Sequence, residues 1–425
     1  MTDRRMSVYD RVFLGYEVTK VVGPFTGITA DRLRAALNSL HANDPSHPAV
    51  CAMEPTGRWR TVSPSEFSRR ALVVELGPDV PGTPDGLAEY GQHHLPLGDR
   101  PLVFAVHNGL ILARFGHPIG SGAYLNTLIA ELMRAAAAGR TPQPPPVRQG
   151  RFLVTRAALR HFGRHPGALL RMLRTLRPAP TSAPKTRTVE GWRATLTTRS
   201  DRSDESATRR VRAWRDRYAP GISVASIVFA ALASAFGQVG LDPDPAGVVL
   251  LVDGQRYLRK SWAAGPNFII GQYLAVPDLR DPRAIHETLH AAIDSGRPLA
   301  AMGLRLLRQP RDIGAENART VPDPVRPRLI LTFGRLDVFA DLPWAVPVDQ
   351  ARHTNVSSVG EPDALSVATW ELNGALHLAA SFHSGVFPPE AVSAALRLFC
   401  SSPVALLPAA GEATSGAGTL AGPPK

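Results

Sequence analysis

One histidine, His117, stands where a strand-like segment meets a helix-like one, and it is the first candidate for chemistry. Residues 110–115 read as a strand, and residues 123–138 have the apolar spacing of a helix. An imidazole takes up and releases a proton near neutral pH, and such a joint can present it to a cleft. We therefore predict that His117 acts in general acid–base chemistry.

Two alternatives to this interpretation remain open at the same turn. Ser121 lies between two glycines and could be the nucleophile of a serine hydrolase, although that turn requires glycine where Ile119 and Ala123 stand. His117 could also be structural, because the chain contains 13 histidines. Its place between a strand and a helix favours the catalytic role.

Strand and helix patterns occur in both halves of the chain and predict a layered α/β fold. The expected strands are 16–22, 71–76, 102–106, 110–115, 247–252, 268–276, 329–333, 365–372 and 375–382, and helices are expected from Thr29 and over 123–138, 204–218, 223–236 and 389–399. A chain of 425 residues exceeds one ordinary core. The proline-containing segment 178–185 predicts domains at 1–178 and 179–411, followed by a disordered tail at 412–425.

The net charge of +12 comes almost entirely from arginine. Between 151 and 177, arginines alternate with apolar residues at spacings of three and four, which predicts two amphipathic helices broken near Pro166. These helices could form a solvated face, a docking surface for an acidic partner or a phosphorylated donor, or a membrane-surface element. Arg171 and Arg174 are the docking candidates. The pattern is not typical of nucleic-acid binding.

The sequence shows no clear pattern for a signal peptide, a membrane span or a metal site. Residues 1–17 lack the pattern of a signal peptide, and the longest apolar run, 223–240, contains polar residues that favour a buried helix over a membrane span. Cys51 and Cys400 give neither a disulfide framework nor a metal-ligand spacing. We expect a cytoplasmic protein without a metal site.

Four short motifs follow one another in an order that carries a resemblance. Gly116-His117-Pro118-Ile119-Gly120-Ser121-Gly122 is followed by Leu250 to Arg256, then by Gly265-Pro266-Asn267-Phe268, then by Leu331 to Arg335. This series resembles the superfamily of chloramphenicol-acetyltransferase-like acyltransferases, which includes condensation domains of nonribosomal peptide synthetases and polyketide-associated acyltransferases. The corresponding family patterns are His-His-x-x-x-Asp-Gly, Val-Asp-x-Arg, Gly-Asn-Phe and Ser-Asn-Leu-Gly or Asp-Phe-Gly-Trp-Gly.

The resemblance implies two similar subdomains in a pseudo-dimeric V, with a channel between them. It implies transfer of an acyl group from a coenzyme A or carrier-protein phosphopantetheine thioester to a hydroxyl or amine, in natural-product or lipid biosynthesis. His117 matches the family's catalytic histidine. The substrate-binding candidates are Ser121, Gly122, Thr332, Gly334 and His383. The structural candidates are Asn267 and a structural pair formed by Asp253 and Arg256. No bound cofactor is implied, an acidic carrier protein is a candidate partner, and the chain is expected to act as a monomer.

The chain departs from the family pattern at two positions of the His117 turn. Gly116 replaces the first histidine, and Ser121 replaces an aspartate that forms a salt bridge with an arginine in relatives. Arg256 would then be the orphaned partner, and a serine hydroxyl supplies no charge to it. Two further functions therefore stay open: a platform that binds a carrier protein or another enzyme, and a catalyst of a ring-forming step without acyl transfer. His93 and His94, followed by Asp99, have nearly the family spacing, but no strand precedes them, and we expect a surface loop there.

Overall fold

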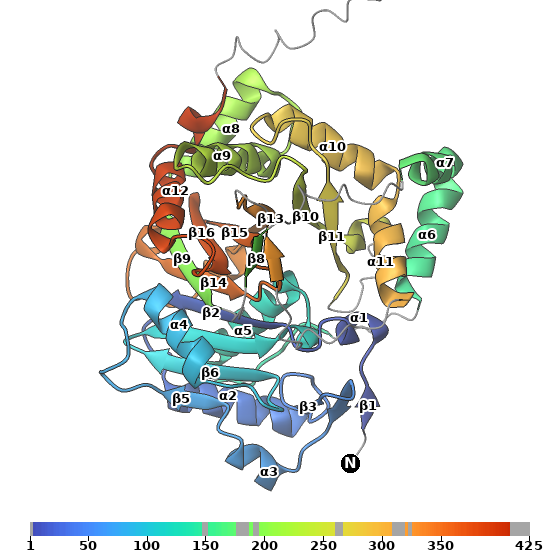
Figure 1. Cartoon of the computed structure of the whole chain (residues 1–425). Coiled ribbons are helices and arrows are strands. Elements are labelled where there is room, and N and C mark those ends of the chain that lie inside the picture. Colours follow the sequence, from blue (N-terminus) through green and yellow to red (C-terminus); the bar gives the residue numbers. More distant parts are fainter. Residues whose placement is uncertain are drawn as a thin grey trace, which may run out of the picture.

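The computed structural model describes residues 3–146, 152–175, 187–189, 195–259, 267–307, 319–321 and 325–408. Two layered halves, each a sheet covered by helices, lie against each other (Figure 1). The expected linker 178–185, the tail 412–425 and Gly265-Pro266 of one motif fall outside these ranges. The predicted two-part α/β fold is confirmed.

A five-stranded sheet organises the N-terminal half, in the order β14-β2-β7-β6-β5. Its strands are β14 (Arg352–Ser357), β2 (Glu17–Gly23), β7 (Leu110–Gly116), β6 (Leu102–His107) and β5 (Val73–Glu75). The surrounding helices are α1 (Val8–Arg11), α2 (Ala30–Asn43), α3 (Pro64–Arg69), α4 (Pro84–His94) and α5 (Gly122–Ala138), and the short strands β1 (Arg4–Arg5), β4 (Arg58–Arg60) and β3 (Ala52–Glu54) form a separate sheet. Helices α2 and α5 pack together in the core on one face of the large sheet, while α4 covers the other.

A six-stranded sheet organises the C-terminal half, in the order β11-β10-β13-β15-β16-β9. Its strands are β11 (Ile269–Leu274), β10 (Val248–Asp253), β13 (Arg328–Arg335), β15 (Ala364–Leu372), β16 (Ala375–His383) and β9 (Leu196–Arg202). The helices of this half are α8 (Ala207–Tyr218), α9 (Val224–Gln238), α10 (Pro282–Asp294), α11 (Arg297–Leu307) and α12 (Pro389–Ser401), and a strand pair joins β8 (Arg187–Val189) to β12 (Arg319–Val321). Side chains alternate along β15, so that Val367 joins the core beneath α9 while Ala368 and Trp370 join the core of the N-terminal half.

Two exchanges of chain tie the halves together. Strand β14 belongs by sequence to the C-terminal half, yet it pairs antiparallel with β2 along its whole length, from Arg352 opposite Gly23 to Ser357 opposite Val18. In the other direction, α6 (Leu153–Arg164) packs against α11, and its Leu153 and Ala157 share a core with Phe268. The arginine-rich helices, which the expected boundary assigns to the first domain, therefore pack on the second half (Figure 1).

The His93-His94 segment is helical, which corrects the expectation of a surface loop. Thr83 caps α4 by accepting a hydrogen bond from the Gly86 backbone, and Pro84 occupies the first turn, where its missing N–H costs nothing. Both histidines are exposed at the last turn of this helix. The segment therefore resembles the His117 turn in spacing alone.

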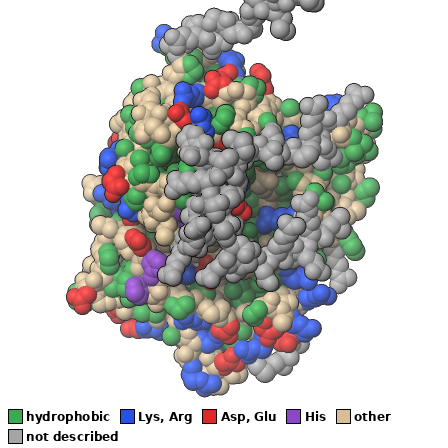
Figure 2. Space-filling model, in the orientation of Figure 1, with side chains coloured by type: hydrophobic (Ala, Val, Ile, Leu, Met, Phe, Trp, Pro, Cys, Tyr) green, Lys and Arg blue, Asp and Glu red, His purple; other side chains and the backbone are tan. Residues whose placement is uncertain are grey.

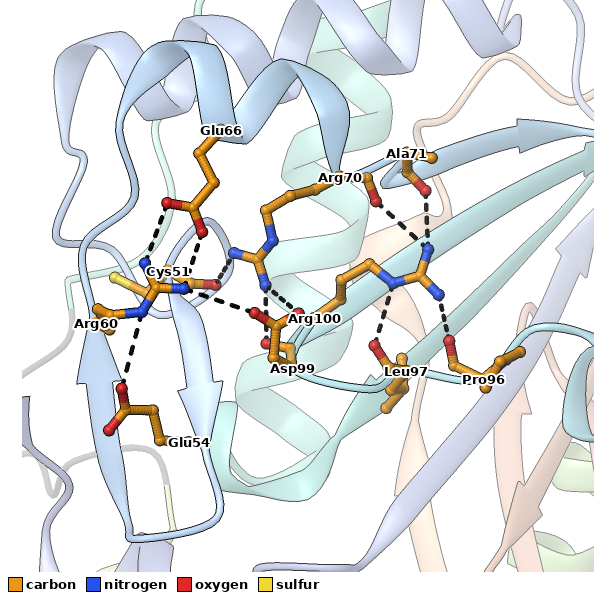
Figure 3. A network of polar contacts seen from close by, with 10 residues as sticks. All are labelled: Cys51, Glu54, Arg60, Glu66, Arg70, Ala71, Pro96, Leu97, Asp99 and Arg100. Atoms are coloured by element: carbon orange, nitrogen blue, oxygen red, sulfur yellow. Dashed lines mark hydrogen bonds and ion pairs between the residues drawn. The ribbon is translucent and has the colours of Figure 1, made fainter.

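Several arginines of the N-terminal half bind main-chain and carboxylate oxygens within one network (Figure 3). Arg60 forms a two-pronged pair with Glu66, and Arg70 contacts an Asp99 carboxylate oxygen at 2.9 Å while donating to the Cys51 carbonyl. Arg100 donates to the carbonyls of Leu97, Pro96, Arg70 and Ala71. Some of the many arginines therefore have structural partners and hold loops together. Within the described ranges, every helix is too short or too polar to cross a membrane.

Candidate active site

The turn after β7 fixes the backbone of His117. Strand β7 ends at Gly116, a short 3₁₀ turn covers His117–Ile119, and α5 begins at Gly122. The His117 N–H donates to the Tyr16 carbonyl at 2.8 Å. Ser121 is the N-cap of α5, and its Oγ accepts from the Tyr124 N–H at 3.4 Å. The expected strand-to-helix joint is present.

Side chains from two distant segments hold this turn. The His117 ring stacks on Phe13 with centroids 4.4 Å apart and an interplanar angle of 15°. Asn267, from the C-terminal half, donates through Nδ2 to the His117 carbonyl at 2.8 Å and to Asp10 Oδ1 at 3.0 Å. Ser7 donates to the other Asp10 oxygen at 2.6 Å. Asn267 therefore fastens the turn to α1, and the position of His117 depends on contacts between the halves.

Burial sets the protonation of these groups. It lowers the pKa of His117 to about 4, and interactions with its own backbone and with Asn267 oppose the shift only in part. Burial also raises the pKa of the Asp10 carboxyl to about 6, despite hydrogen bonds from Ser7 and Asn267. At neutral pH the His117 imidazole is uncharged and can accept a proton.

A cavity of about 390 Å³ opens beside His117, between the two sheets. Residues of both halves line it, among them His117 and Gly122 from the first and Asp253, Thr332 and Gly334 from the second. A side chain at Gly334 would meet the Trp370 ring, since a Cβ there would lie 2.4 Å from it. Five of the residues singled out from the sequence thus meet at one cavity.

Asp253 and Arg256 do not form the pair that the resemblance implied. Asp253 lines the cavity at the end of β10 and accepts from the Gln255 N–H at 2.9 Å. Arg256 is exposed in the following 3₁₀ turn, and these two described side chains make no ion pair. Partial desolvation raises the pKa of Asp253, while the hydrogen bond from Gln255 and the charge of Arg256 act in the opposite direction. The Arg256 side chain is therefore solvated, and water can stabilise its charge without a carboxylate partner.

Two predicted substrate-binding residues lie outside the cavity lining. The Ser121 side chain is buried as the cap of α5, so its hydroxyl is engaged in a structural contact. His383 is buried at the end of β16, with Nε2 3.0 Å from the Val359 carbonyl. The structure provides neither residue with access to a ligand in this cavity.

Lys20 lines the cavity and was not singled out from the sequence. It lies on β2 with its ammonium over the Trp370 ring, 4.5 Å from the centroid. A signal was available, since alternation along the strand places Lys20 on the same face as Val18 and Val22, where an apolar side chain is expected. Lysine is also rare here, with four among 48 basic residues.

The predicted docking surface combines arginine with exposed leucine. Arg171 is exposed on α7 (Pro166–Thr175), whereas the side chain of Arg174 is outside the described part of the structure. Large apolar side chains are exposed along α6 and α7 (Figure 2), namely Leu159, Leu169, Leu170 and Leu173. Solvation alone does not explain so many exposed leucines on two neighbouring helices.

The sequence matches no family model and no curated protein. Solved structures of similar shape do exist. The first condensation domain of the CDA synthetase superposes with a TM-score of 0.58 at 15% identity, over 97% of this chain and 98% of that one. Polyketide synthase associated protein 5 from Mycobacterium tuberculosis gives a TM-score of 0.56 at 16% identity, covering 94% and 98% of the two chains.

A trichothecene 15-O-acetyltransferase, TRI3 from Fusarium sporotrichioides, gives a TM-score of 0.61 at 11% identity, with 95% of each chain covered. This chain has the chloramphenicol-acetyltransferase-like fold. The two halves are the two subdomains of that fold, and the cavity beside His117 lies between them. At these identities the likeness establishes the architecture, and the chemistry has to be argued from the cavity itself.

Proposed function

We propose that this protein transfers an acyl group from a thioester to a hydroxyl or amine acceptor, with His117 as general base. The observation that carries the proposal is an uncharged, buried imidazole lining a cavity between the two subdomains. Structural neighbours that include an O-acetyltransferase and condensation domains support the same reaction class. The thioester would be acyl-coenzyme A or an acyl-phosphopantetheine, bound as a co-substrate.

The reaction balances without a covalent enzyme intermediate. The lone pair of the acceptor's oxygen or nitrogen attacks the thioester carbonyl. At the same time His117 accepts the proton from that atom. Collapse of the tetrahedral intermediate breaks the carbon–sulfur bond, and the imidazolium returns the proton to the departing thiolate. Apolar walls such as Phe115, Phe333 and Trp370 limit the access of water, which would otherwise hydrolyse the thioester.

The exposed face of α6 and α7 is the proposed donor-docking surface. Arg171 supplies positive charge there, beside Leu170 and Leu173. Such a surface complements the phosphates of coenzyme A or an acidic carrier protein. The biosynthetic origin of the neighbours supports a place in natural-product or lipid biosynthesis.

The test measures thiol release from a panel of acyl-coenzyme A esters mixed with small alcohols and amines. His117→Ala is compared with His94→Ala, which removes an exposed histidine on α4. We expect acceptor-dependent thiol release in the wild type and in His94→Ala, and its loss in His117→Ala. Equal release by both variants would contradict the proposal.

Mass spectrometry separates the remaining alternatives. An acyl group found covalently on Ser121, together with loss of turnover in Ser121→Ala, would replace the proposal with the hydrolase mechanism. Binding of a carrier protein without transfer from any donor would favour the platform function.

A further inference from the structure

Lys20 lines the cavity, and its buried ammonium has no polar partner among the described residues. The residue is 3% exposed, and its Nζ has neither a hydrogen bond nor an ion pair among the described residues. Its ammonium lies over the face of the Trp370 ring. Burying an ammonium without a counter-charge costs free energy that this contact offsets only in part.

A second unpaired donor belongs to Trp370, another residue that lines the cavity. The indole Nε1 of Trp370 is buried and has no hydrogen-bond partner among the described residues. Asn126 on α5 also lines the cavity, and its Oδ1 is buried and equally unpaired. Buried polar groups are nearly always satisfied, so two donors and one acceptor left open at a single cavity indicate that a ligand completes them.

Apolar side chains form much of the lining around these groups, and Asn355 and Thr332 add polar groups to it. Val18, Leu125, Phe115, Phe333 and Val338 line the cavity together with Lys20. A ligand that fits has an apolar body, and it carries a single negative charge that reaches the ammonium. We propose that Lys20 binds the carboxylate of an apolar hydroxy or amino acid, which serves as the acyl acceptor. This inference deepens the proposed function and rests on it for the role of the ligand as acceptor.

Among the titratable groups around the cavity, we expect Lys20 to govern anion binding. His117, His353 on β14 and His377 on β16 are uncharged at neutral pH, because burial lowers the pKa of each. Arg335 on β13 is engaged at the rim by Asp337 and Glu371. Asp253 is the carboxylate facing the cavity from β10, where it is exposed.

Protonation of Lys20 ties this binding to pH. Burial lowers the pKa of Lys20 to about 7, so the cation and its neutral amine are both populated near neutrality. A carboxylate binds the cationic form, hence its affinity falls as pH rises above this value. An arginine would stay charged throughout, and lysine is the residue that can lose its charge here.

Calorimetry with octanoate and octanamide tests the assignment without any acyl donor. The two probes share a chain and differ in charge. At about pH 6, where Lys20 is mainly protonated, we expect octanoate to bind the wild type at least about tenfold more tightly than it binds Lys20→Met. Octanamide should bind both proteins alike. Thr19→Val, a change on the other face of the same strand, is the matched control and should retain octanoate binding.

Equal binding of octanoate by wild type and Lys20→Met would overturn the proposal, as would equal binding of the two probes by the wild type. A pH series on the wild type keeps the test independent of how the variant folds. The dissociation constant of octanoate should rise about fivefold between about pH 7 and about pH 8. A flat series overturns the proposal. Because no turnover is measured, these results stand apart from those of the His117 variants.

Discussion

The two polar ends of the cavity are built in opposite ways. At one end Phe13 stacks on the His117 ring, and Asn267 and Tyr16 hold its main chain, while the ring Nδ1 is buried without a hydrogen-bond partner among the described residues. At the other end Lys20 has an aromatic face and no hydrogen-bond partner in the described structure. Burial lowers both pKa values, yet contacts within the protein fix the backbone and the ring plane at His117, while the Lys20 ammonium has only an aromatic face beside it. The comparison separates a group that performs chemistry from one that selects the substrate.

The largest effect is expected at His117. His117→Ala should lower kcat by about 10²- to 10⁴-fold, because removal of a general base slows the proton transfer. Lys20→Met should act mainly by raising KM for an acidic acceptor. Steady-state kinetics with acid and amide forms of one acceptor measure the difference. The comparison fails if both variants lower kcat equally and leave KM unchanged.

The pH profile of kcat/KM should show the titration of both His117 and Lys20. Activity requires neutral His117 and protonated Lys20, so it declines below about pH 4 and again above about pH 7. Lys20→Met should abolish the upper decline and keep the lower one. Persistence of the upper decline in this variant would assign it to another group.

Stability should also respond to Lys20, with a sign that depends on pH. The folded pKa of about 7 lies below the unfolded value, so unfolding takes up a proton above that pH and stability rises toward pH 10. Below about pH 7 the full cost of the buried charge is present. Lys20→Met should therefore melt at a higher temperature than the wild type in acid, and the gap should narrow in alkali. Thermal melts of both proteins across this pH range measure the difference in melting temperature. A difference that stays constant with pH would count against a buried charge at Lys20.

A smaller effect is expected from the contact that joins α1 to the catalytic turn. Asn267→Ala leaves the Asp10 carboxyl and the His117 carbonyl without their shared donor, which should destabilise the fold by about 1–3 kcal/mol. It should also reduce kcat while His117 remains present. Denaturant unfolding and kinetics of the same preparation measure both. An unchanged kcat would show that the turn holds its position without the second half.

The smallest effect is expected at the docking surface. Arg171→Glu should raise KM for acyl-coenzyme A several-fold at low salt, and the difference should shrink at high ionic strength. Arg58→Glu makes the same change of charge at an exposed residue of β4 and is the control. If both variants behave alike, the exposed face of α6 and α7 does not receive the donor.

The sequence was informative where local pattern decides structure. The strand, turn and capped helix around His117 follow from alternation and spacing, and the order of weak motifs led to the correct fold. Lys20 and β14 were missed because their environment depends on pairing between residues more than 300 positions apart, as with Asn355 opposite Lys20. The Asp253–Arg256 pair failed for a related reason, since motif order does not fix where an arginine side chain points.

Strand β14 also dictates an order of events during synthesis. The edge of β2 that carries Lys20 stays open until residue 357 has left the ribosome, because only then can β14 pair with it. Until that moment the lysine remains in water and the strand edge is available to other chains. A fragment ending before residue 352 would expose this edge permanently. The N-terminal half therefore cannot complete its five-stranded sheet without residues 352–357 of the C-terminal half.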